Sequence, residues 1–282
     1  MAKVAVIGAL SFDTLIGRTG TQRKLGGAAV YSGLTFSLLK HDTTILSAVP
    51  SSETDWLAEA IGGRLHYHFA ESRYPTHFIN DERGEVRQQR VDSLAETLRS
   101  SDFPDGDFDW IHLGPLHPMD FGPEMLALAR GRCQSLSVDL QGWCREIQDG
   151  AVIARWDSRW NDQLDYLDWV KADEEEWEVF SRATGLDAAT AVKQYQWQGL
   201  LITKGAGGGE LFAASERRSW SAVIPARQDS ETGAGDVFTA GFASAVLKGE
   251  SIPDSLKFAA ALAGKHVAGE WLSGSVLGFL ET

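Results

Sequence analysis

A run of small residues followed by an acid, Thr232-Gly233-Ala234-Gly235-Asp236, could carry phosphate chemistry. The apolar residues that follow have helical spacing, so the run predicts the start of a helix. Small side chains leave the first N–H groups of such a helix bare, and with the helix dipole they can bind an anion such as phosphate. Asp236 could then accept the proton of a hydroxyl held beside the phosphate, as phosphoryl transfer to an alcohol requires. Taken alone, the run more often marks an ordinary helix start capped by an acid.

A second group of residues near the N-terminus could bind hydroxyls. Residues 4–8 form a short apolar run closed by glycine, which predicts the first buried strand of a parallel sheet. Asp13 follows this strand, at the edge where open α/β sheets bind ligands, and the pair Gly26-Gly27 would let a substrate approach the backbone closely. Sugar hydroxyls would suit both features. A solvent-facing Asp13 and glycines that only form a turn remain the alternative.

Composition favours a small-molecule enzyme. The 282 residues carry a net charge of -13, which argues against nucleic acid or an anionic membrane as a partner. Cys133 and Cys144 are too few for a disulfide framework and lack metal-site spacing, so they indicate ordinary thiols in a reducing compartment. The apolar run after Lys3 lacks the length of a signal peptide or a membrane span. We therefore expect a cytoplasmic protein.

Strand and helix patterns alternate along the chain. Further apolar strands are predicted within residues 109–116, 135–145, 167–173 and 199–212, and no linker or repeat divides the sequence. The pattern predicts one α/β domain, residues 1–282, with a doubly wound, mostly parallel sheet covered by helices on both faces. The glycine-dense turn after residue 203 is not a P-loop, because the order of its residues differs and no helix follows.

Together these segments resemble the ribokinase-like (PfkB) carbohydrate and nucleoside kinases over nearly the whole chain. The resemblance implies that Asp236 is the catalytic base and that the backbone of Gly233, Ala234 and Gly235 forms an anion hole. It also implies ATP as phosphoryl donor, with Mg²⁺ as cofactor. The sequences of residues 113–116 and 139–145 resemble an inositol kinase-like branch of the family more than ribokinase itself.

The family's acceptor-binding positions fall on Asp13, Gly26, Gly27, Gln141 and Arg145 in this sequence. The resemblance implies that Asp13 binds hydroxyls of the acceptor and that Gly26 and Gly27 begin the acceptor-binding helix. The last two residues would contact the acceptor or close the site. Without the family, an arginine at a strand end more often forms a surface ion pair.

The family's nucleotide-binding positions fall on Thr203, Gly205 and Thr232, and its metal network falls on Asp173 and Glu176. Oxygen ligands with several retained waters are what magnesium prefers, so the two acids are expected to act on the ion indirectly, through water. A solvated, acidic helix start explains the same two acids without a metal.

Two departures from the family pattern stand out. Tyr31 occupies the position where the family usually has an asparagine, which argues against a ribose-type acceptor. Ser230 stands where an aspartate that helps hold a monovalent cation is expected, and Asp229 is displaced by one residue. Whether Asp229 replaces that aspartate is open, so potassium dependence cannot be carried over.

Residues 74–91 predict a polar hairpin around a glycine-bearing turn, outside the main sheet. It could pair with the extended stretch of residues 12–25, and the resemblance implies that these two segments form a small β lid beside the acceptor. A homodimer through this lid is also possible. An exposed hairpin without such a role is the alternative.

The sequence thus predicts an ATP-dependent carbohydrate kinase that phosphorylates a hydroxyl of a small polyol, sugar or inositol. The first alternative is a nucleoside kinase of the same fold. The second is a non-catalytic relative that binds a sugar or nucleotide to regulate a partner.

Overall fold

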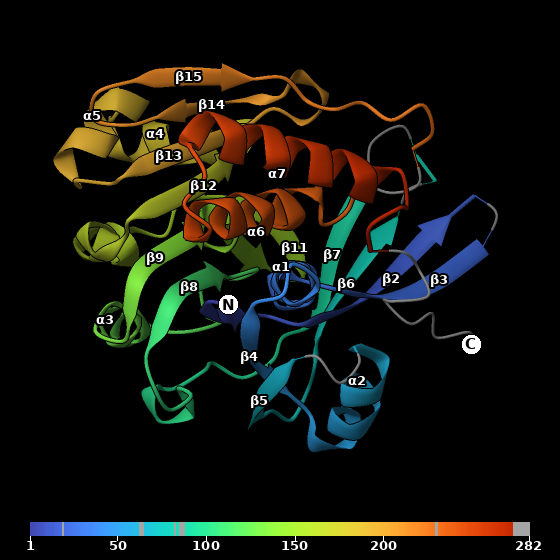
Figure 1. The fold of residues 1–282 in the computed structure, drawn as a ribbon. Helices are drawn as coiled ribbons and strands as arrows, with labels where there is room; N and C mark the ends of the chain where they lie inside the picture. Colours follow the sequence, from blue (N-terminus) through green and yellow to red (C-terminus); the bar gives the residue numbers. More distant parts are fainter. Residues whose placement is uncertain (19, 62–64, 82, 85–87, 229–230, 273–282) are drawn as a thin grey trace.

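A nine-stranded sheet lies at the centre of the computed structural model, which describes residues 1–18, 20–61, 65–81, 83–84, 88–228 and 231–272 (Figure 1). Every pairing in the sheet is parallel except those of its last two strands, β14 and β15. From one edge to the other the strands are β15 (Arg217–Trp220), β14 (Gly209–Phe212), β13 (Gly199–Thr203), β12 (Trp169–Asp173), β9 (Cys133–Asp139), β8 (Phe108–Gly114), β1 (Lys3–Gly8), β4 (Asp42–Val49) and β5 (His66–Glu71).

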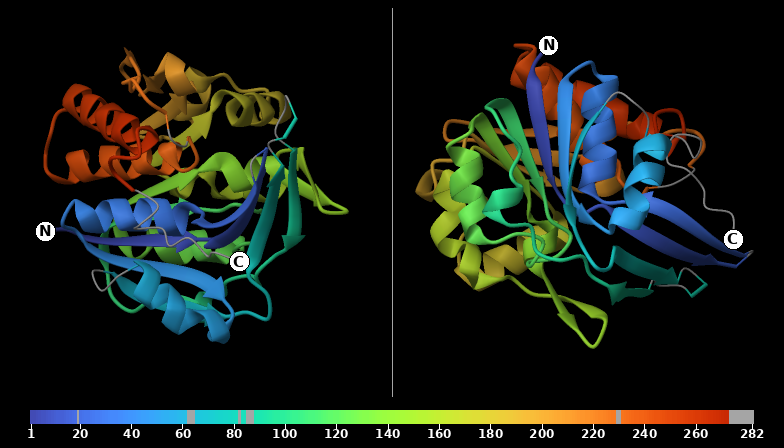
Figure 2. Two further views of the ribbon diagram at one scale, coloured as in Figure 1. Left: turned by 90° about the vertical axis from the view of Figure 1, so that its right-hand side faces the viewer. Right: turned by 90° about the horizontal axis from the view of Figure 1, so that it is seen from below.

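Helices cover both faces of this sheet (Figures 1 and 2). One apolar core packs α3 (Pro123–Arg130), α4 (Glu174–Thr184) and α5 (Ala188–Gln194) against the strands. The cores of the opposite face include α1 (Ala28–Leu38), α2 (Thr54–Ile61), α6 (Ala234–Leu247) and α7 (Ile252–Val267). In the described part of the chain, none of the helices has the length and apolar character needed to cross a membrane. The predicted doubly wound α/β class is confirmed.

A second sheet of six strands projects from one side of the molecule (Figures 1 and 2). Its order is β10 (Arg145–Gln148), β11 (Ala151–Ala154), β7 (Gln88–Ser93), β6 (Thr76–Asp81), β2 (Ser11–Gly17) and β3 (Gly20–Gly26). The strands β6 and β7 of the predicted hairpin thus join the sheet formed by residues 11–26, and β6 pairs in parallel with β2. Residues 82 and 85–87 of the hairpin lie outside the described residues. The hairpin of β10 and β11 was not predicted.

The strand order places a binding edge at the carboxyl ends of the central strands. From β1 the chain proceeds to β4 and β5 on one side and then to β8, β9, β12 and β13 on the other. The order therefore reverses between β1 and β8, and open α/β sheets bind ligands at such a switch point. A Cβ atom at Gly8 would lie only 2.2 Å from the carbonyl oxygen of Gly114, so the two strand ends approach closely there.

Candidate active site

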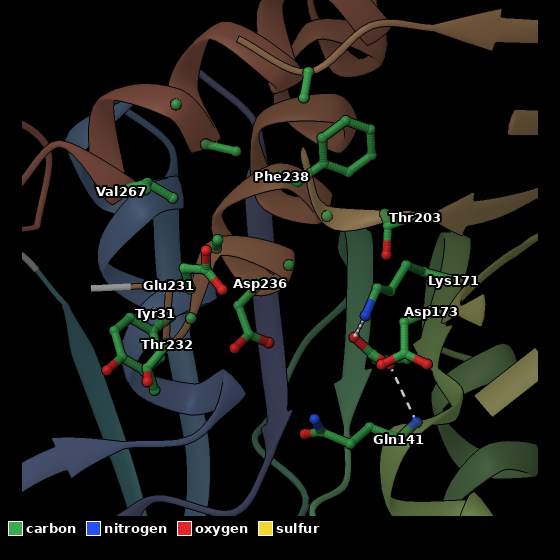
Figure 3. A pocket seen from close by; sticks show the side chains of 18 of the residues that line it. Tyr31, Gln141, Lys171, Asp173, Thr203, Glu231, Thr232, Asp236, Phe238 and Val267 are labelled. Atoms are coloured by element: carbon green, nitrogen blue, oxygen red, sulfur yellow. Dashed lines mark hydrogen bonds and ion pairs between the residues drawn. The ribbon is translucent and has the colours of Figure 1, made fainter. Parts of the chain in front are cut away.

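A cavity of about 590 Å³ opens at this edge of the larger sheet and is also lined by the second sheet and by helices α6 and α7. Its volume lies within the range usual for small-molecule sites. Asp236, Lys171 and Gln141 come from three separate elements, and Figure 3 shows their side chains around a common space. The cavity thus joins residues that are far apart in sequence.

The helix start predicted at the small-residue run is present as the beginning of α6. Gly233 precedes the helix in the left-handed conformation, with φ 84°, and no side chain caps the helix start. The Ala234 N–H donates to the Glu231 carbonyl at 3.1 Å. The N–H groups of Gly235 and Asp236 then lie in the first turn, where a helix offers no carbonyl partner. Gly235 belongs to the predicted anion hole, whereas Asp236 does not, and the Ala234 N–H of that hole is already engaged. Anion binding at this helix start stays a prediction.

Two neighbouring helices brace this helix start. The Tyr31 ring of α1 fills the space beside Gly233, where a Cβ atom would lie 2.4 Å from its Cδ1 atom. His266 of α7 lies with Nε2 2.8 Å from the Thr232 carbonyl oxygen, and its ring meets the Tyr31 ring edge-on at 5.5 Å between centroids. These contacts fix the position of the loop that leads into α6.

Asp236 has the electrostatic character of a general base. Burial raises the pKa of its carboxyl group to about 7; Asp139 raises this pKa further, while Lys171 and Arg145 oppose the shift. A carboxylate with a pKa near neutrality combines substantial basicity with a large ionised fraction at pH 7. Because one face of Asp236 borders the cavity, a bound hydroxyl could reach it.

A buried ion cluster lies beside Asp236. The ammonium group of Lys171 in β12 lies 2.9 Å from a carboxylate oxygen of Asp139 in β9 and 3.8 Å from one of Glu176. Burial alone would lower the pKa of Lys171, but the two carboxylates more than offset it, so this pKa is raised. Burial also raises the pKa of Glu176, against the effect of Lys171. Lys171 therefore remains charged at neutral pH.

The acceptor-side residues of the sequence analysis come together at one end of the cavity. Asp13 of β2, Gly27, Gln141 and Arg145 line it, and the Arg145 guanidinium donates to the Leu116 carbonyl at 3.4 Å. Gly26 is not a lining residue. A Cβ atom there would lie 2.8 Å from the Asp13 carboxylate, so the glycine instead makes room for that side chain.

The other end of the cavity is largely apolar. Its walls include small residues of α7 (Ala260, Ala263 and Gly264), the Trp220 and Phe238 rings, and Val223 and Ile224. The two rings stack with centroids 5.0 Å apart, while Val223 and Ile224 are 50% and 63% exposed. Thr203, Gly205 and Thr232, the predicted nucleotide-binding residues, also line the cavity.

The two predicted metal-network acids occupy different places. Asp173 lines the cavity, whereas Glu176 lies behind it, and the two form a reciprocal cap at the start of α4 through 2.8 Å bonds. Among the residues that the structure describes, no three His, Cys, Asp or Glu side chains gather to hold a metal. A water-mediated role of the two acids toward a metal ion stays a prediction. Asp229 and Ser230, the positions that bear on a monovalent cation, lie outside the described residues.

Sequence reasoning missed the ion pair of Lys171 and Asp139, although one signal was available. Lys171 interrupts an otherwise apolar strand, and a lysine in such a strand is rare unless it is paired. It also missed Trp220 and Gln89, since neither belongs to a recognisable motif.

Comparison with known proteins locates a family domain in the C-terminal half of the chain. The model of the pfkB family of carbohydrate kinases matches residues 144–270. The chain therefore carries a PfkB family domain. Arabidopsis thaliana ribokinase is 38% identical over 113 residues, which cover 36% of this chain and 29% of that relative. The match thus spans less than a third of the curated relative's length.

Solved structures extend the similarity to the whole fold. A pyrophosphate-dependent kinase of the ribokinase family, complexed with a pyrophosphate analog and myo-inositol, is 25% identical with a TM-score of 0.80, covering 94% of this chain and 95% of that one. Arabidopsis thaliana ribokinase complexed with ribose and ATP is 18% identical with a TM-score of 0.71, covering 98% and 95%. The ribokinase-like PfkB resemblance is confirmed, and of these two structures the inositol-bound one is the more similar.

Proposed function

We propose that this PfkB protein is an ATP-dependent phosphotransferase acting on a hydroxyl of a small polyol, sugar or inositol. The observation that carries the proposal is the position of Asp236. Its carboxyl group, with a pKa of about 7, lies at the anion-binding start of α6, between a polar and an apolar end of one cavity. A base, a phosphate site and room for two substrates are what phosphoryl transfer to an alcohol requires.

The polar end suits a polyol acceptor. Asp13 can accept hydrogen bonds from hydroxyls, Gln141 can both accept and donate them, and Arg145 only donates. The adjoining Tyr31 and Leu116 give the ring of the acceptor apolar surface to rest on. Asp236 would take the proton of the reacting hydroxyl as the phosphoryl group arrives, and the N–H groups at the start of α6 would hold that group's oxygens.

The apolar end suits the base of a nucleotide. Small side chains of α7 and the exposed Val223 and Ile224 form an apolar surface. A nucleotide base could pack against this surface, whereas inorganic pyrophosphate has no apolar group to do so. ATP is therefore the proposed donor. Mg²⁺ would enter with it and neutralise its phosphates, with Asp173 at hand to bond the ion's waters. Pyrophosphate is the second candidate, favoured by the 25% identity with a pyrophosphate-dependent kinase.

The second sheet is proposed as the lid of this single kinase domain, because it supplies Asp13, Phe78, Gln89 and Arg145 to the cavity wall. Closure would keep water from the phosphoryl group. Shortening the hairpin between β6 and β7 should then raise the acceptor KM and increase ATP hydrolysis without acceptor. If the acceptor KM and the rate of ATP hydrolysis are both unchanged, the second sheet does not act as a lid.

A homodimer through this sheet and a cytoplasmic location stay predictions.

The test is a matrix of acceptors and donors. Purified protein is incubated with inositols, sugars and nucleosides, each with ATP or pyrophosphate, and release of ADP or phosphate is measured. We expect turnover of a polyol with ATP. Preference for a nucleoside would favour the nucleoside kinase alternative, and binding without turnover would favour the regulatory one.

One variant separates the two donors. Ala263→Trp fills the apolar end, so it should raise the KM for ATP at least about tenfold and leave the acceptor KM unchanged. Lys265→Trp, on the exposed side of the same helix and outside the cavity lining, is the matched control. If wild-type protein uses pyrophosphate and not ATP, the donor assignment is wrong.

A further inference from the structure

Lys171 lies in β12 with almost no contact with bulk water. Its side chain is 7% exposed, and its neighbours in the strand, Val170 and Ala172, are fully buried. Burying an ammonium group is costly unless it is paired, and the carboxylates of Asp139 and Glu176 provide the pairing. Replacing such a cluster with apolar residues is often neutral or stabilising, so its presence at a cavity invites a functional explanation.

The ammonium group borders the start of α6. A Cβ atom at Gly235 would lie 3.2 Å from Lys171 Nζ, and Lys171 is itself a lining residue of the cavity. Figure 3 shows the Lys171 side chain entering the site near Asp236. The charge therefore lies next to the N–H groups that would hold a phosphoryl group.

The charge balance of the cavity makes this cation important. Among the described lining residues five are acids (Asp13, Asp139, Asp173, Glu231 and Asp236), and two are cations (Arg145 and Lys171). Arg145 belongs to the acceptor end, where it bonds the Leu116 carbonyl. A polyphosphate entering a cavity with this excess of negative charge would be repelled unless a cation met it at the phosphate site.

We propose that Lys171 is a further catalytic residue of this site, which contacts the phosphoryl group during its transfer and neutralises charge there. The proposal rests on the proposed function. An ammonium group has three N–H donors, and two carboxylates within 4 Å engage part of them, so a donor remains for the cavity that Lys171 lines. The bond from the phosphoryl group to the donor oxygen breaks and the bond to the acceptor oxygen forms. Asp236 takes the acceptor's proton, and Lys171 keeps its own protons throughout.

Asp139 has a different role, as a positioning residue. One of its carboxylate oxygens holds the Lys171 ammonium, and the other accepts a 3.1 Å bond from the Gln141 N–H. If Lys171 served only to compensate buried carboxylates, loss of Lys171 and loss of Asp139 would break the same ion pair. The two losses would then weaken anion binding to a similar extent. If Lys171 meets the phosphate, the two losses change the charge at the phosphate site in opposite directions.

Binding of inorganic pyrophosphate in EDTA, measured by calorimetry without acceptor, distinguishes these cases. We expect Lys171→Gln to weaken pyrophosphate binding at least about tenfold, as loss of a charge-assisted hydrogen bond implies. Asp139→Asn should not weaken it, because it removes a negative charge. Lys204→Gln removes the same charge from the end of the neighbouring strand, outside the cavity lining, and is the matched control. Equal weakening by Lys171→Gln and Asp139→Asn, or none by Lys171→Gln, would overturn the proposal.

Steady-state kinetics gives a second readout. Lys171→Gln should lower kcat about 10²-fold or more and change the acceptor KM less than about threefold, because its contact is with the phosphoryl group. Where the single variant does not fold, Asp139→Asn is compared with the double variant Asp139→Asn/Lys171→Gln, in which a positive and a negative charge are removed together. The double variant should bind pyrophosphate at least about tenfold more weakly than Asp139→Asn does. Equal binding by these two variants would overturn the proposal.

The two proposals fail separately. If no acceptor is turned over but Lys171→Gln still weakens pyrophosphate binding, the kinase proposal fails and the phosphate contact stands. If Asp236→Asn abolishes turnover while Lys171→Gln binds pyrophosphate like the wild type, the kinase proposal stands and the role of Lys171 is wrong.

Discussion

The substitution Asp236→Asn tests the proposed chemistry most directly. Asparagine keeps the shape and hydrogen-bonding reach of the side chain but cannot accept the proton of the acceptor. Positioned general bases contribute about 10²–10⁴-fold, so kcat should fall by at least this order while ATP affinity changes less than about tenfold. Glu231→Gln removes another carboxylate of the same cavity, five residues earlier and exposed, and should have a much smaller effect.

The pKa of Asp236 sets the expected pH dependence. Since the carboxyl group titrates at about 7, kcat/KM of the wild type should rise about tenfold per pH unit below 7 and level off above it. The same shift affects stability. Folding raises this pKa from 3.8, so the native state holds the proton more tightly, and stability falls as pH rises between about 4 and 7.

The size of that stability effect follows from the shift. A difference of about three pKa units corresponds to roughly 4 kcal/mol above pH 7, an upper limit because water in the cavity screens part of it. Asp236→Asn is free of this cost, so its Tm should exceed that of the wild type more at pH 8 than at pH 5. Thermal melts at both pH values and steady-state kinetics measure the two effects. Turnover within about fivefold of the wild type would refute the assignment of Asp236 as the base, and an equal Tm difference at both pH values would refute its burial-raised pKa.

Two further substitutions test the bracing of the helix start. Gly233→Ala should lower both kcat and Tm, because the residue has positive φ and its Cβ would collide with Tyr31; Gly185→Ala, with positive φ but nothing within 4 Å of a Cβ, should lower Tm alone. His266→Ala loses the contact with the Thr232 carbonyl, so kcat should fall about tenfold with the acceptor KM nearly unchanged. Kinetics and melting curves check both, and an equal loss of kcat in the two glycine variants would contradict the first.

Short contiguous patterns were enough to predict part of the candidate site. The start of α6 could be predicted because its glycines and its acid are contiguous, and the chemistry of a bare helix start depends on those few residues alone. Asp13 was found for a similar reason, since it follows a recognisable buried strand. Its place in the second sheet was predicted through the pairing of residues 12–25 with the hairpin of residues 74–91, and not from β2 itself, which is only partly buried and has a weak periodicity.

The ion pair of Lys171 and Asp139 shows why other parts of the site escaped. These residues are directly opposite each other in the parallel pairing of β9 and β12, although 32 positions separate them in the sequence. A pattern within one strand cannot reveal its neighbour in a sheet, and here the β10–β11 hairpin intervenes along the chain. The apolar end of the cavity has the same character, since β15, α6 and α7 each supply part of it.

The same ion pair explains how a strong cation and a usable base can coexist in one cavity. Lys171 alone would lower the pKa of Asp236 and make it a poor proton acceptor. Asp139 opposes this effect from the next strand while holding the ammonium group in place. Burial of the carboxyl group is the largest cause of the raised pKa. The cavity can therefore offer positive charge to a phosphoryl group without reducing the basicity that the acceptor hydroxyl requires, because the carboxylate that positions the cation also offsets its field at Asp236.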